Sequence, residues 1–197
     1  MDNHPDNLIL AKARQMAIQA HLGETTATGE PLSSRACAIR NFLNGMFSQQ
    51  GMKQAPVAMQ AAALLHAAVA RNAATYDQIA IQFGENVAEL VYWNTPVAHE
   101  LATGETAAHL NHRRIQQASR AAQILKTCEI ACVTAELALS AEGAERFLEQ
   151  SMPILKTIGT ITPDDLYRCV TRYGLDRMHG QAPGLAHKQD HHMEAEQ

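Results

Sequence analysis

The stretch PVAMQAAALLHAAVAR, from Pro56 to Arg71, constrains the fold more than any other part of the sequence. Pro56 suits the first position of a helix, because proline has no N–H to donate there. From Val57 to Val69 apolar residues then occupy nearly the whole circumference of the predicted helix, which also carries His66. A helix with so little polar surface must be covered on most sides. We therefore expect it at the centre of a helical bundle.

The rest of the pattern is also helical. The chain is 46% hydrophobic, much of this alanine, and only 5% aromatic, which favours close-packed helices over a β-sandwich. Asp6 is a candidate cap for the first helix, and Thr75–Gln78 (TYDQ) is a capping box. The fold class predicted is all-α. The predicted helices cover about 6–21, 33–50, 56–69, 75–83, 85–93, 143–158 and 163–173, with a long helix that starts at about 113 and includes Cys132, and a loop at GETTATGEP.

Length and composition indicate one domain, residues 1–175, followed by a flexible tail, residues 176–197. The tail loses helical periodicity and is rich in Gly, Pro and charge, as disordered segments are. Its histidines could bind Ni²⁺ or Zn²⁺ adventitiously, although a solvated tail is the favoured interpretation. These histidines are His179, His187, His191 and His192.

Charge and targeting signals exclude several classes of partner. The net charge of −4 has mixed signs along the chain, so we expect no nucleic-acid partner and no membrane surface partner. No apolar run approaches the ~20 residues of a membrane span, and the N-terminal residues MDNHPDNLIL do not resemble a secretory signal. The scattered cysteines suit reduced thiols, so we expect a cytoplasmic protein. Cys128 and Cys132, four residues apart, are interpreted as core residues rather than metal ligands.

Four segments together resemble a known family: AIQAHLGETTATGEP, AAALLHAAV, YDQIAIQFGENVAELV and AAQILKTCEIA. In order and spacing they are similar to the HD-type hydrolase domain of the RelA/SpoT family, which removes pyrophosphate from the alarmone (p)ppGpp. The resemblance covers about Leu10 to Ala138. It implies an HD-domain-like bundle of several helices.

The same resemblance implies that the metal site has been lost. Family members hold Mn²⁺ with a histidine after the Gly-x-Pro loop, a His-Asp pair and a later aspartate. These positions fall on Arg35, on His66 with Ala67, and on Glu129. One ligand is kept, one is longer by a methylene group, and two are absent. Carboxylate oxygens and imidazoles are the ligands that suit Mn²⁺, and most of these ligands are missing here. We therefore expect no metal and no other cofactor.

Two further parts of the family's machinery are also changed. The acidic pair that assists the attacking water falls on Ala70 and Arg71, and the basic residues that hold the guanine fall on Thr26 and Ala27. No residue is therefore predicted to be catalytic. The resemblance predicts a catalytically inactive relative that acts as a binding or regulatory module, for a small anion or a protein partner.

Alternatives remain at single residues. A lone histidine on an apolar helix, such as His66, is usually a buried core residue. Arg35 and Arg71 are expected either to pair with Glu129 or Glu30, or to grip a small anion between them. The alternative function is a phosphohydrolase acting on (p)ppGpp, another nucleotide or another phosphoester with a rebuilt site. Such a site would use His66 and Glu129 with His21 or Glu30.

Overall fold

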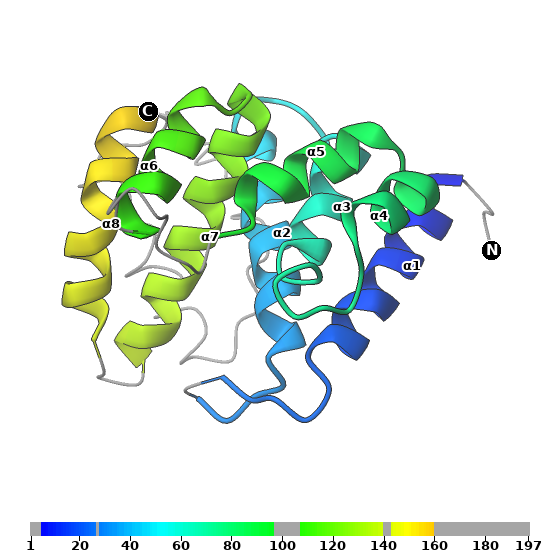
Figure 1. Cartoon of the computed structure of the whole chain (residues 1–197), viewed down its shortest axis with the longest axis horizontal. Helices are drawn as coiled ribbons and strands as arrows, with labels where there is room; N and C mark the ends of the chain where they lie inside the picture. The colour runs from blue at the N-terminus through cyan, green and yellow to red at the C-terminus, as the bar shows by residue number, and fades with distance from the viewer. Residues whose placement is uncertain (1–4, 27, 97–106, 140–142, 160–197) are drawn as a thin grey trace, which may run out of the picture.

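The computed structural model describes residues 5–26, 28–96, 107–139 and 143–159. Within these ranges it contains eight helices and one isolated β-bridge, between Thr25 and Pro31, so the all-α prediction is confirmed. Figure 1 shows the helices in chain order. They are α1 (Pro5–Ala20), α2 (Ser33–Gln49), α3 (Val57–Leu65), α4 (Tyr76–Phe83), α5 (Glu85–Asn94), α6 (Ala107–Gln117), α7 (Arg120–Leu139) and α8 (Ala144–Ile158).

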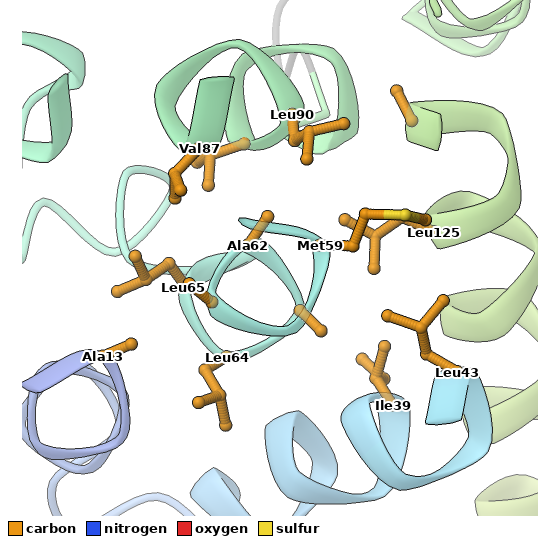
Figure 2. Close-up of a cluster of buried hydrophobic side chains, with 14 of the residues drawn as sticks. Ala13, Ile39, Leu43, Met59, Ala62, Leu64, Leu65, Val87, Leu90 and Leu125 are labelled. Carbon is orange, nitrogen blue, oxygen red and sulfur yellow. The ribbon is translucent and has the colours of Figure 1, made fainter. Parts of the chain in front are cut away.

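Helix α3 is the centre of the bundle, as its sequence predicts. All seven residues Met59–Leu65 are buried. Figure 2 shows α3 surrounded by Ala13 from α1, Leu43 from α2, Val87 from α5 and Leu125 from α7. The alanine side chains of α3 are small, so the neighbouring helices can approach it closely and fill the interior to the density of an organic crystal.

The end of α3 differs from the prediction. The apolar pattern continues to Val69, but the helix ends at Leu65, with His66 as its C-terminal cap residue. Residues beyond it form tight turns in which the amide of Ala68 donates to the carbonyl of Leu65, and those of Ala73 and Ala74 donate to the carbonyl of Ala68. Ala68 and Ala74 are buried in these turns. The apolar residues therefore fill the core without continuing the helix.

The capping box before α4 is confirmed. The Thr75 hydroxyl accepts a hydrogen bond from the amide of Gln78, and the Gln78 side chain accepts one from the amide of Thr75. Asp6, by contrast, lies in the first turn of α1, which begins at Pro5, rather than at the capping position. An acidic residue in the first turn still interacts favourably with the helix dipole.

The predicted long helix from about Arg113 is two helices, α6 and α7. Ser119 separates them and caps α7, since its hydroxyl accepts from the amide of Ala122 at 3.4 Å. The Gln123 side chain donates to the carbonyl of Ile115 at 3.1 Å, which satisfies a carbonyl near the end of α6. A polar Ser-Arg pair inside an apolar pattern thus marks a boundary that periodicity alone does not show.

Helix α8 packs on α6 and α7 at one side of the bundle (Figure 1). The predicted helix at 163–173, the boundary at residue 175 and the tail histidines lie outside the described residues. In the part of the chain that is described, no helix is long and apolar enough to cross a membrane.

Candidate functional site

The three charged or polar residues at the predicted ligand positions come from three separate helices. Arg35 lies in the first turn of α2, His66 caps the end of α3, and Glu129 lies in the middle of α7. They are close enough for charge to act between them: Glu129 opposes the lowering of the His66 pKa, and Arg35 contributes to the lowered pKa of Glu129. Ala67 follows His66 and is half-buried. The fold therefore brings these separated residues into one neighbourhood.

Arg35 forms a two-pronged ion pair with Glu136. Its Nε donates to Oε2 at 2.9 Å and its Nη2 donates to Oε1 at 2.7 Å. The side chain of Glu136 is only 5% exposed and that of Arg35 is 27% exposed. Parallel hydrogen bonds of this kind fix the guanidinium in place as well as neutralising the carboxylate. The prediction that Arg35 pairs with Glu129 or Glu30 is wrong. Its partner is Glu136, which lies two turns after Glu129 on α7.

Glu129 is neutralised from its own helix. The Lys126 ammonium donates to Glu129 Oε2 at 2.8 Å, one turn away. Burial, the largest single effect, would raise the pKa of Glu129, but Lys126, His66 and Arg35 together outweigh it and hold this pKa below its usual value. Glu129 is thus an ionised carboxylate whose charge a lysine already balances.

His66 is a half-buried histidine with one nitrogen engaged. Its Nδ1 lies 3.1 Å from the carbonyl oxygen of Ala63. A carbonyl only accepts, so Nδ1 carries the proton and Nε2 is the free nitrogen of the neutral ring. Burial lowers the pKa of His66, which favours this neutral form.

His21 is a second histidine beside the first. The two ring centroids are 6.5 Å apart. His21 is buried, and burial lowers its pKa, although Glu24, with its carboxylate 3.6 Å from Nδ1, opposes this effect. The His21 and His66 rings therefore form a neutral pair between α1 and the end of α3.

Arg71 lies at the rim of this neighbourhood. Its Nη1 donates to Glu24 at 2.6 Å, and both side chains are more than a third exposed, at 44% and 37%. The expected partner Glu30 instead accepts a hydrogen bond from the Ser34 hydroxyl. Ala70, the other position of the family's acidic pair, is exposed and adds no polar group. The two arginines are therefore held by two different carboxylates and do not form one open anion pocket.

The loop that precedes α2 is ordered by its own hydrogen bonds. The amide of Thr26 donates to the carbonyl of Glu30 at 2.7 Å, and the amide of Glu30 donates to the Thr26 hydroxyl at 3.2 Å. Thr26 is buried, so it acts as a structural residue of the loop. Ala27, which was predicted to fall on the neighbouring guanine-binding position, lies outside the described residues.

The described residues do not fit the family's metal. Among them, no group of three or more His, Cys, Asp and Glu side chains is arranged to hold an ion. Two cations, Arg35 and Lys126, bind the carboxylates of this region. Cys128 and Cys132 are buried core residues, and burial raises the pKa of Cys128 well above its usual value, so its thiol stays protonated. A thiol in this state is a poor ligand.

Comparison with known proteins defines the class to which this fold belongs. The profile of the HD domain family matches residues 13–138, so the chain belongs to the HD domain family. A solved structure is similar over 88% of this chain and 97% of its own, with 15% sequence identity and a TM-score of 0.66; it is described as a metazoan ortholog of SpoT that hydrolyzes ppGpp and plays a role in starvation responses. No curated protein matches this chain by sequence. The predicted RelA/SpoT-like HD fold is confirmed.

Three charged residues of the site were not predicted from the sequence: Glu136, Lys126 and Glu24. Glu136 lies seven residues after Glu129 on α7, so the two share a helix face, and Lys126 lies one turn before Glu129. The spacing along α7 could have identified Lys126 and Glu136 from the sequence, but it does not concern Glu24.

Proposed function

We propose that this HD domain is catalytically inactive and acts as a binding or regulatory module. The observation that carries the proposal is the Arg35–Glu136 ion pair, with both prongs at 2.9 Å or less. A guanidinium at a ligand position repels a divalent cation, and here it is also fixed by a buried carboxylate. The loss of the aspartate at Ala67 and of the water-assisting acids at Ala70 and Arg71 supports the same conclusion.

A protein partner is favoured over a small anion as the ligand of this module. Both arginines of the region already hold carboxylates, so an anion would have to displace Glu136 or Glu24. The alternative rebuilt hydrolase lacks an assembled set of ligands: His21 stands beside His66, but Glu30 is bonded to Ser34 and Glu129 to Lys126.

Incubation of the purified chain with ppGpp and Mn²⁺ tests the proposal. We expect no release of pyrophosphate above that of buffer, because metal activation of the attacking water requires ligands that are absent. The His66→Ala variant, which should be equally inactive, is the matched control. Metal-dependent release by the wild type that disappears in His66→Ala would establish the rebuilt hydrolase instead.

A further inference from the structure

The outer side of α1 has no partner among the described helices. Helix α1 packs on α3 and α2 (Figure 1). The buried residues on this inner side are Ala13 and Ala17. On the opposite side Leu8 is 59% exposed and Ile18 46% exposed, and Leu22, in the turn after the helix, is 82% exposed. Single exposed apolar residues are ordinary on protein surfaces, but three large ones along one side of a helix and the turn that follows it mark a candidate interaction site.

The spacing of this row is that of a helix-pairing seam. Leu8, Ala11, Gln15, Ile18 and Leu22 follow one another at intervals of three, four, three and four residues, and all five are exposed. We call these five residues the α1 stripe. Within α1, alternating steps of three and four keep Leu8, Ala11, Gln15 and Ile18 on the face that a neighbouring helix covers in a coiled coil, and Leu22 extends the series into the turn after Ala20. Ile81 on α4, although 84% exposed, belongs to no such series.

The charges beside the α1 stripe indicate the kind of helix that would cover it. The exposed residues Lys12 and Arg14 flank it on its two sides, and the acids Asp6 and Glu24 lie only at its ends. A second copy would bring its own Lys12 and Arg14 to the same interface and no acid beside the stripe to balance these four cations. Like charges at these positions disfavour a second copy of this chain. Two cations on a chain of net charge −4 are also few for binding an anionic membrane.

We propose that the α1 stripe docks an amphipathic helix of another protein, whose apolar seam is flanked by Glu or Asp. Such a helix would cover Leu8, Ile18 and Leu22 and place its acidic flanks beside Lys12 and Arg14. This inference names the partner class for the proposed binding module and rests on that function only in this respect, since none of the five residues of the α1 stripe belongs to the degenerate site.

Two fluorescent three-heptad peptides test the proposal with the full chain. Both carry Leu at the seam positions; one has Glu and the other Lys at the flanking positions, so that each repels its own copies. We expect fluorescence anisotropy to show that the Glu peptide binds about tenfold more tightly than the Lys peptide, with a preference that weakens at high salt. The charge-reversed variant Lys12→Glu/Arg14→Glu should prefer the Lys peptide.

Apolar contact is tested with Ile18→Ser/Leu22→Ser, which should lose binding of both peptides, while Ile81→Ser should bind as the wild type does. Circular dichroism checks that each variant is folded. Equal affinity for the two peptides, or no binding of either, would overturn the proposal. Dimerisation that Ile18→Ser/Leu22→Ser abolishes would assign the stripe to a second copy, and binding to anionic vesicles without peptide binding would assign it to a membrane. Pyrophosphate release from ppGpp would overturn the inactive state alone and leave the peptide result unaffected.

Discussion

Glu136 is a carboxylate in the protein interior, 5% exposed, and Arg35 neutralises it. Replacing Arg35 with alanine removes this positive charge and leaves the carboxylate in a site of low dielectric. Breaking a buried ion pair from one side costs about 3 kcal/mol or more, and the partial exposure of Arg35 puts this case near the lower end. We expect Arg35→Ala to reduce the free energy of unfolding by about 3 kcal/mol in urea titration.

The double variant Arg35→Met/Glu136→Met is the control for this prediction. It removes both charges and keeps similar volumes, so its stability should lie within about 1 kcal/mol of the wild type. If the single and double variants lost the same stability, the ion pair itself would not explain the effect of Arg35→Ala.

His21 and His66 make stability depend on pH. Burial lowers both pKa values below 6.5, so the unfolded chain takes up protons in a pH range where the folded chain does not. Stability is therefore complete above about pH 6.5 and falls as the pH decreases below it, by at most about 1.4 kcal/mol per pH unit for each histidine. Unfolding free energies at pH 7.5 and 5.5 measure this loss.

The variants His21→Gln and His66→Gln should each lose less stability than the wild type between these two pH values. His109→Gln, on the exposed side of α6, should behave as the wild type does. A wild-type stability that stayed constant or increased on acidification would contradict the neutral state of the pair.

At the scale of the elements, α3 should contribute more per residue to the free energy of unfolding than its neighbouring helices do. Leu65 is fully buried against several helices, and Leu65→Ala would leave a cavity that the surrounding helices fill only in part. We expect a loss of about 2 to 5 kcal/mol, measured by chemical denaturation. Ile81→Ala on α4, where the side chain is 84% exposed, should change stability by less than about 0.5 kcal/mol. Similar losses in the two variants would mean that α3 is not the centre of the core.

The helices were predictable where a sequence pattern is compatible with only one local backbone structure. The apolar circumference of Val57–Leu65 requires a buried helix, and TYDQ requires a capped start, because each pattern has one local solution. The end of α3 and the break at Ser119 were not predictable in this way. At both places apolar residues still pack in the core where the backbone has left the helix. The apolar periodicity of the sequence therefore continues past the end of the helix.

At the scale of the whole molecule, the bundle and the positions of Arg35, His66 and Glu129 near one another could be predicted, because the family's motifs keep their order and spacing. The ion-pair partners could not. Glu136 and Glu24 belong to no family motif, and the choice of Glu136 over Glu129 depends on how α2 meets α7 in space. The cluster around Arg35, His66 and Glu129 is thus held together by residues whose role appears only in the folded structure.

The central claim is that fixed charges of the chain have replaced the metal of an HD domain. In the variant Arg35→His/Ala67→Asp/Glu129→Asp, the three substituted residues and His66 would recreate the ligand set that the resemblance implies. Adding Glu136→Gln removes the carboxylate that Arg35 would no longer neutralise. Weak Mn²⁺ affinity is sufficient, because the groups that orient the ligands in active relatives are not restored.

The most direct test is the Mn²⁺ bound by both proteins, measured by elemental analysis of the protein and buffer compartments after equilibrium dialysis against millimolar Mn²⁺. We predict no stoichiometric metal on the wild type and a clear excess over it, approaching about one ion per chain, on the folded variant. About one Mn²⁺ per wild-type chain, lost in His66→Ala, would contradict the account.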